Sequence, residues 1–126
     1  MLSQATIDNI PGGYHRCSLE EGHPFLYISN RFLAILGWTR EEIRTIFDNK
    51  FDNMLHPDDR NLSSDYVTRI LDTRGHGSAK DQIYRLLGKD GYHWVTDATT
   101  LVKSGNQTFF QGNITDFTDF VEGKGK

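Results

Sequence analysis

The chain has 126 residues, of which 37% are hydrophobic, 25% charged and 12% aromatic. Such a length and composition are typical of one globular domain that buries about 65–70% of its unfolded surface, and they exclude a disordered chain. The formal net charge of −3, without a lysine or arginine run, argues against a surface for nucleic acid or for anionic membranes.

The first predicted elements are two short strands and a helix. The strands cover residues 13–18 and 24–28, and the glycine-containing turn between them is typical of a hairpin. The helix follows at once, because Ser29 or Asn30 is a suitable N-cap and Gly37 can end the helix in the left-handed conformation. Its apolar stripe consists of Phe32, Leu33, Ile35 and Leu36.

The clearest local signal predicts a second helix that begins at residue 40. Thr39 and Glu42 stand three positions apart, as the N-cap and N3 residues of a capping box do. Trp38 and Ile43 occupy the flanking positions of a hydrophobic staple. Both signals place the start of the helix at the same residue.

A loop and a third helix are predicted next. Residues 48–55 are rich in Asp and Asn, which is typical of a loop. Pro57 suits the first turn of a helix, and Asp58 and Asp59 would lie at the positive end of its dipole. Apolar residues recur at helical spacing to about Asp72, namely Leu62, Tyr66, Val67, Ile70 and Leu71.

The pattern of the last part of the sequence predicts three strands, at residues 82–87, 92–102 and 108–116. Turns at residues 88–91 and 104–106 would join them. Both faces of the middle strand carry apolar residues, so we expect both to be covered at least in part. The helices would cover one face, and the N-terminal segment, a flanking helix or a second subunit the other. The element order predicts an α+β fold: a five-stranded antiparallel sheet with helices packed on one face.

Residues that could do acid–base or metal chemistry are present but not grouped. His56 stands beside Asp58 and Asp59, yet adjacent carboxylates point in different directions around a helix, so a helix start is the favoured interpretation. No two histidines have the His-x-x-x-His spacing of a helical metal site. We therefore expect no catalytic residues and no metal site from the histidines, which are His15, His23, His56, His76 and His93.

A set of apolar and aromatic residues predicts either a ligand cavity between helices and sheet or a close-packed core. The sequence does not distinguish the two alternatives. The set consists of Phe32, Leu36, Trp38, Tyr66, Ile70, Leu87, Trp94 and Phe110.

The last strand ends in the segment GNITDFTDF, which places Asp116 and Thr118 where the chain leaves the fold. Short side chains of this kind are good helix N-caps, because they accept hydrogen bonds from the free backbone donors of the first turn. An acid also suits the positive end of a helix that begins around residues 119–121. The alternative is a terminal strand that finishes in a solvated turn.

Five segments resemble those of a PAS domain in order and rough spacing, over about residues 6–120. They are IPGGYHR, FLYISNRFLAILGWTREEI, MLHPDDR, YRLLGKDGYHWV and GNITDFTD. The last resembles the Asp-hydrophobic-Thr exit motif of bacterial PAS domains. The resemblance implies a PAS-like, profilin-like fold with strands and helices in the order ββαααβββ. It also implies that Asp116 and Thr118 tie the last strand to the connecting helix of an effector.

The resemblance gives no support to a haem or flavin cofactor. Some PAS domains bind haem through a histidine on the long helix before the third strand, but residues 57–73 contain no histidine. The flavin-binding branch needs a cysteine in an Asn-Cys-Arg-Phe-Leu-like helix, whereas the single cysteine, Cys17, lies in the first predicted strand. We expect Cys17 to be a small buried or half-buried side chain, and a single cysteine excludes an internal disulfide.

The leading hypothesis is a non-catalytic sensor that detects a small ligand or a partner and relays the signal through Asp116 and Thr118. The effector would be a C-terminal histidine kinase, GGDEF-type diguanylate cyclase or phosphodiesterase, and the domain would form a homodimer. The alternatives are a ligand-free dimerisation module and, less favoured, a haem or flavin sensor.

We expect residues 1–120 to be one domain and residues 121–126 an exit or tail. The chain contains no apolar stretch of ~18 residues and no signal-peptide pattern. We therefore expect a cytoplasmic protein without direct membrane contact.

Overall fold

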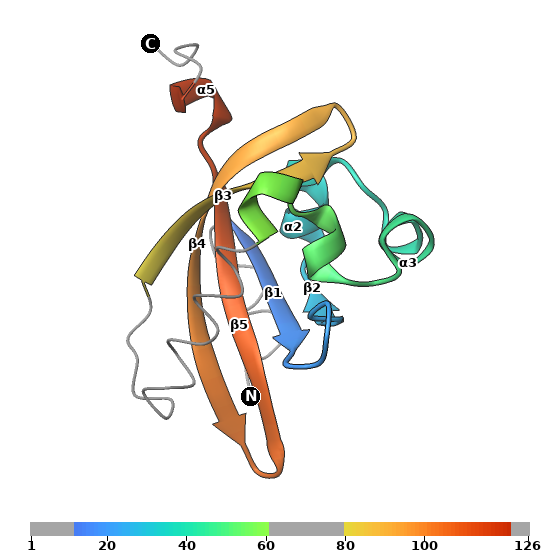
Figure 1. Ribbon diagram of the computed structural model, residues 1–126, viewed down its shortest axis with the longest axis vertical. Helices are drawn as coiled ribbons and strands as arrows, with labels where there is room; N and C mark the ends of the chain where they lie inside the picture. Colours follow the sequence, from blue (N-terminus) through green and yellow to red (C-terminus); the bar gives the residue numbers. More distant parts are fainter. Residues whose placement is uncertain (1–11, 61–79, 122–126) are drawn as a thin grey trace.

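The computed structural model describes residues 12–60 and 80–121, which form one antiparallel sheet with helices on one of its faces (Figure 1). The sheet has five strands in the order β2-β1-β5-β4-β3. The strands are β1 (Gly13–Ser18), β2 (Phe25–Ile28), β3 (Lys80–Gly88), β4 (Gly91–Ser104) and β5 (Gln107–Asp116). The predicted α+β architecture is confirmed, and the last strand, β5, lies at the centre of the sheet.

The strand pairing brings the first and last parts of the described chain together. β3, β4 and β5 pair in sequence as antiparallel neighbours, and β1 pairs antiparallel with β5, so the early hairpin extends the sheet beyond β5. Cys17 of β1 lies opposite Phe110 of β5. Figure 1 shows β5 running between β1 and β4 and continuing directly into the terminal helix.

The helical segments lie in the connections and after the last strand. They are α2 (Asn30–Leu36), α3 (Arg40–Phe47), η1 (Phe51–Met54), η2 (Pro57–Asp59) and α5 (Thr118–Val121). The Ser29 side chain caps α2, and Gly37, at φ 84°, ends it in the left-handed conformation that a residue without Cβ adopts easily. The capping box of Thr39 and Glu42 forms as predicted at the start of α3.

The predicted loop over residues 48–55 differs from the structure, and the predicted third helix lies only partly within the described residues. The Asp/Asn-rich stretch was predicted as a loop, but its apolar residues Phe51 and Met54 turn inward and form η1, because burying them requires a compact turn. The third predicted helix begins as the short turn η2. Its continuation over Leu62, Tyr66, Val67, Ile70, Leu71 and Asp72 lies outside the described residues.

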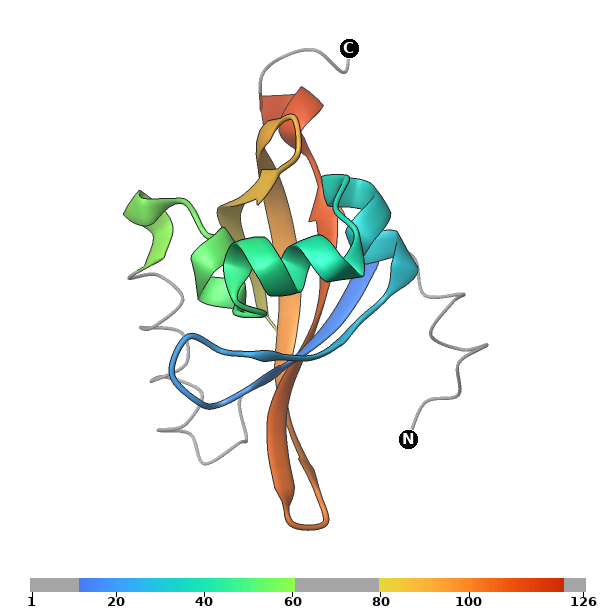
Figure 2. The same cartoon turned by 90° about the vertical axis from the view of Figure 1, so that its right-hand side faces the viewer.

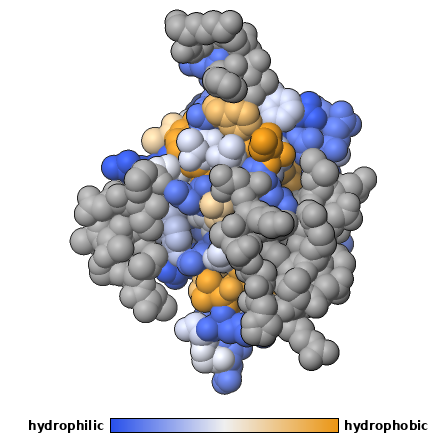
Figure 3. Space-filling view, turned by 90° about the vertical axis from the view of Figure 1, so that its left-hand side faces the viewer, coloured by the Kyte–Doolittle hydropathy of each residue, from blue (hydrophilic) through white to orange (hydrophobic). Residues whose placement is uncertain are grey.

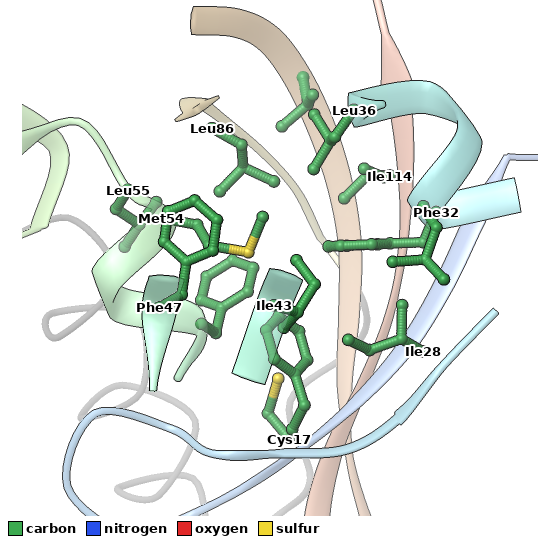
Figure 4. Packing of buried hydrophobic residues seen from close by; sticks show 14 of the residues in the cluster. Cys17, Ile28, Phe32, Leu36, Ile43, Phe47, Met54, Leu55, Leu86 and Ile114 are labelled. Atoms are coloured by element: carbon green, nitrogen blue, oxygen red, sulfur yellow. The ribbon is translucent and has the colours of Figure 1, made fainter. Parts of the chain in front are cut away.

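The hydrophobic core lies between the sheet and the helices α2, α3 and η1 (Figure 2). Figure 4 shows its side chains converging from both layers, with Leu36 and Phe32 of α2 near Ile114 of β5. Trp38 covers one edge of this core, and its indole Nε1 donates a hydrogen bond of 2.9 Å to the Leu87 carbonyl. The largest fully buried side chains are Phe32, Leu36, Ile43, Met54, Leu55, Leu86, Ile114, Val95 and Asp97.

The part of the face away from the helices that is visible in Figure 3 carries both hydrophobic and hydrophilic side chains. Arg85 and Trp94 face each other there on paired strands, with the guanidinium carbon 4.8 Å from the centre of the indole ring. Within residues 12–60 and 80–121, no helix has the length and apolar character needed to span a membrane.

Candidate functional site

The chain leaves the sheet through a set of hydrogen bonds made by the last residues of β5 and the first residue of α5. The Asp116 carboxylate oxygen Oδ1 accepts from the Thr118 backbone N–H at 2.9 Å and from the Thr118 hydroxyl at 2.6 Å. The same hydroxyl oxygen accepts from the Trp94 backbone N–H at 2.9 Å. The Phe117 N–H donates to the Trp94 carbonyl at 2.9 Å. We call Trp94, Asp116, Phe117 and Thr118 the exit junction.

The exit junction fixes the start of α5 to two strands at once. The Thr118 hydroxyl continues the hydrogen bonding of β5 with β4 beyond the last ladder pair, which joins Val95 and Asp116. The ring of Phe117 lies 6.5 Å from the ring of Trp94 and adds an apolar contact. α5 begins at Thr118, one residue before the predicted range, because Asp116 caps it from two positions upstream.

His93 links the exit junction to the turn between β3 and β4. Its Nδ1 lies 2.7 Å from Asp116 Oδ2, and its Nε2 lies 2.6 Å from Asp90 Oδ1. Burial disfavours the charged imidazole, but the hydrogen bonds to Asp90 and Asp116 outweigh it and raise the pKa of His93. Burial likewise works against the Asp116 carboxylate, yet Thr118 and His93 hold its pKa below the usual value.

The His-Pro-Asp-Asp segment reaches the exit junction through a second chain of contacts. Asp59, whose side chain is 8% exposed, accepts three hydrogen bonds of 2.9 Å from the Arg85 backbone N–H, Nε and Nη2. These hydrogen bonds hold the pKa of Asp59 below its usual range. Arg85 stacks on Trp94, and Trp94 contacts Phe117. The predicted helix start is therefore also a clamp between η2 and β3.

A buried polar cluster occupies the centre of the inner face of the sheet. We use this name for His15, Cys17, Tyr84 and Asp97, none of which is more than 4% exposed. His15 Nε2 lies 3.0 Å from Asp97 Oδ2, which also accepts a hydrogen bond from the Tyr84 hydroxyl. Asp97 Oδ1 accepts from the Asn113 backbone N–H at 3.0 Å, and Cys17 Sγ lies 3.5 Å from His15 Nδ1.

The buried polar cluster is an ion pair stabilised by its surroundings. Burial opposes the charge on His15, but the Asp97 carboxylate raises the pKa of His15 to about 10. Burial also opposes the charge on Asp97, and His15 and Tyr84 lower its pKa in spite of it. The imidazole stacks on the ring of Phe51 at 5.4 Å with an interplanar angle of 10°, which favours a cation. The inner face of the sheet therefore has a charged imidazolium and a carboxylate, His15 and Asp97, at its centre.

A comparison with protein families identifies the fold. The family model described as the PAS fold matches residues 25–114. The chain belongs to the PAS fold family. The match runs from β2 to Ile114, two residues before the end of β5, so it includes α2, α3, β3, β4 and most of β5. A comparison of the PAS domain with curated proteins finds no match.

Solved structures share the fold of this PAS domain at low sequence identity. The LOV domain of a blue-light activated histidine kinase from Erythrobacter litoralis is 11% identical, with a TM-score of 0.62 over 86% of this chain and 98% of that chain. The N-terminal domain of a diguanylate cyclase with a PAS/PAC sensor from Marinobacter aquaeolei is 21% identical, with a TM-score of 0.61 over 85% and 95%. An RNA-binding light-oxygen-voltage receptor is 17% identical, with a TM-score of 0.70 over 94% and 33%. These identities show the fold alone.

The structure of the PAS domain separates the residues predicted to line one cavity. Phe32 and Leu36 are fully buried in the core, with Trp38 and Leu87 partly buried against it. Trp94 instead lies beside Arg85 on the other face of the sheet. Phe110 is buried on β5, with its ring 6.1 Å from that of His23, and Tyr66 and Ile70 lie outside the described residues.

Two residues that the sequence analysis did not select are central to the structure. Asp97 follows Val95 by two positions on β4, so strand alternation puts both side chains on the inner face. An acid at such a core position could have been recognised from the sequence as a buried polar site. Strand alternation puts His93 on the same face as Val95 and Asp97, but its contact with Asp116 depends on the pairing of β4 with β5. Among the described residues, no three His, Cys, Asp or Glu side chains form a group suited to a metal ion.

Proposed function

We propose that this PAS domain is a non-catalytic sensor module that detects a small ligand or a partner and passes the signal through the exit junction to a C-terminal effector. A ligand can bias such an effector only by the difference in its affinity for two arrangements of the domain. The proposed relay therefore requires a connection between the sheet and the departing helix that is specific enough to differ between those arrangements.

The observation that supports this proposal is the position of the exit junction. Thr118, the first residue of α5, is bonded both to the end of β5 and to the backbone of β4. β5 is the central strand and pairs with β1 and β4, so a displacement of either neighbour acts on Asp116. α5 then points away from the sheet, at the end of the described chain (Figure 1).

We propose a GGDEF-type diguanylate cyclase, a histidine kinase or a phosphodiesterase as the effector. Two of the similar structures come from a blue-light activated histidine kinase and from a diguanylate cyclase with a PAS/PAC sensor. Both names describe a sensor attached to an enzyme, and this supports the class of effector. We further propose that the domain acts as a homodimer without contact to nucleic acid or membrane.

We propose that the domain works without flavin or haem. A flavin adduct needs a reactive cysteine on a helix beside the cofactor, whereas Cys17 lies on β1, 3% exposed and 3.5 Å from His15 Nδ1. Burial raises the pKa of the Cys17 thiol, which lowers its reactivity. The ion pair of His15 and Asp97, with the Phe51 ring stacked on His15, occupies the inner face of the sheet, so a cofactor there would have to displace them. Purified protein without absorbance above 350 nm would agree with this proposal, and a coloured protein would contradict it.

The alternative of a ligand-free dimerisation module shares the same exit but needs no interior site. Native mass spectrometry with a denatured control distinguishes the two functions. A small molecule that co-purifies with the folded protein supports sensing by a ligand. A dimer that carries no additional mass supports assembly alone.

The relay is tested in a protein that contains the domain and its effector. Asp116→Ala and Thr118→Ala each remove side-chain hydrogen bonds of the exit junction, and we expect loss of regulation with the catalytic rate of the effector retained. The matched controls are Thr115→Ala and Asp119→Ala, because both side chains are exposed and lie beside the same junction. Normal regulation in the Asp116 and Thr118 variants would contradict the proposal, and so would equal losses in the control variants.

A further inference from the structure

The contacts of His93 require a particular protonation state. A neutral imidazole has one N–H and one bare nitrogen, so it can donate to a single carboxylate. Both ring nitrogens of His93 nevertheless lie within 2.7 Å of a carboxylate oxygen, Asp90 Oδ1 on one side and Asp116 Oδ2 on the other. Only the imidazolium satisfies both contacts, because a bare nitrogen at that distance would face a negative oxygen. We call Asp90, His93 and Asp116 the histidine bridge.

From this geometry we propose that the proton on His93 is a switch that controls how firmly the exit junction is held. With the proton, the histidine bridge braces Asp116, the residue that caps α5, against the turn between β3 and β4. Without it, one of the two carboxylates loses its donor and the brace opens. This inference rests on the proposed relay, because it assigns a regulatory input to the same junction.

The surroundings of His93 leave the two carboxylates as its dominant charged neighbours. The turn also carries Lys89, but the ammonium of Lys89 pairs with Glu42 of α3 at 3.1 Å. On β3, the cross-strand partner of His93 is the apolar Leu86. α5 contributes the exposed acid Asp119, and the C-terminal end of α2 faces the turn with a backbone carbonyl that accepts from the Lys89 N–H.

The histidine bridge is accessible to solvent protons, unlike the buried polar cluster. The His93 side chain is 15% exposed and that of Asp116 is 30% exposed, against 3% for both His15 and Asp97. Burial opposes the charged imidazole, but the hydrogen bonds to the two acids raise the pKa of His93 above its ordinary value. The brace is therefore closed below the pKa of His93 and opens as the pH rises through it.

The two acids are not equivalent, and this suggests a variant that locks the bridge. The Asp90 side chain is 79% exposed and sits on the turn, whereas Asp116 already accepts two hydrogen bonds from Thr118. In Asp90→Asn, the introduced amide N–H₂ can donate to the bare Nε2 of a neutral imidazole. His93 then keeps its single N–H on Nδ1 for Asp116, and the brace no longer depends on the proton.

Amide hydrogen exchange of the Thr118 N–H, followed by NMR and corrected for intrinsic exchange rates, measures the opening of the junction. A charge-assisted hydrogen bond corresponds to roughly a tenfold or larger change in an equilibrium constant. We expect the opening of the parent chain to increase about tenfold as His93 titrates, with the His93 ring signals reporting the titration. We expect His93→Gln to be open at every pH and Asp90→Asn to stay closed.

The matched control is His23→Asn. His23 pairs with Asp52 at 2.9 Å with side chains 15% and 30% exposed, the same values as for His93 and Asp116, and Asn tolerates its φ of 54°. This variant should leave the pH dependence at Thr118 unchanged. Exchange at Thr118 that stays constant while His93 titrates would overturn the switch and leave the relay intact. Suppose instead that Thr118 exchange in the parent chain follows the His93 titration, but regulation stays normal in Asp116→Ala and Thr118→Ala. That result would contradict the relay and leave the switch intact.

Discussion

Removal of the positive charge from the buried polar cluster tests how the interior of the domain is held together. His15→Gln leaves the Asp97 carboxylate, whose side chain is 3% exposed, without its counter-ion. Breaking a buried ion pair by removing one partner typically costs about 3–5 kcal/mol. Asp97 keeps the donors from Tyr84 and from the Asn113 N–H, so we expect the lower end, about 3 kcal/mol.

Urea unfolding at pH 7, followed by far-ultraviolet circular dichroism, measures this loss. With a slope of about 1.5 kcal/mol/M for a small domain, a loss of 3 kcal/mol lowers the unfolding midpoint by about 2 M. His23→Asn is the control, because it removes the partly exposed pair with Asp52 and should cost less than about 1 kcal/mol. Equal losses in the two variants, or a loss below 1 kcal/mol in His15→Gln, would refute the assignment of a buried ion pair.

Three further predictions concern the same layers of the fold. The folded pKa of His15 is raised from 6.5 to about 10, so the stability that the pair contributes is complete below pH 6.5 and is lost as the pH rises toward 10. Urea midpoints should fall further over this window in the parent than in His15→Gln, which keeps only the contribution of the raised pKa of His93. Asp59→Asn should destabilise the domain by about 1–3 kcal/mol, because Arg85 loses a charged acceptor, and an unchanged midpoint would contradict the clamp. Gly112→Ala should cost about 1–3 kcal/mol, because the added Cβ would collide with Asp97 Oδ1 and lie 2.6 Å from His15 Nε2. A melting temperature equal to that of the parent would contradict the packing described for the buried polar cluster.

Local signals in the sequence predicted the local structure well. The capping box of Thr39 and Glu42 and the left-handed Gly37 depend on residues within one helical turn, so their geometry follows directly from residue type. The order of strands and helices, together with short turns between the last three strands, was sufficient to predict the sheet. The inward turn of Phe51 and Met54 was not predicted, because their burial depends on the sheet against which they pack.

The site was predicted only where its residues are close in sequence. Asp116 and Thr118 are two residues apart, and capping chemistry indicated a helix start there. The contact of Asp116 with His93 spans 23 positions, and the pair of His15 and Asp97 spans 82, so both depend on strand register. Trp94 was grouped with the interior residues by its aromatic character, although strand alternation assigns it to the opposite face from Val95.

The central claim is that the hydroxyl of Thr118 couples the sheet to the departing helix, and a pair of variants tests it most directly. Thr118→Ser keeps a hydroxyl that can donate to Asp116 and accept from the Trp94 N–H, whereas Thr118→Val keeps the shape and removes the hydroxyl. The measurement is the output of the attached effector with and without its stimulus. The account predicts normal regulation in Thr118→Ser and loss of regulation in Thr118→Val. Equal regulation in the two variants would contradict it.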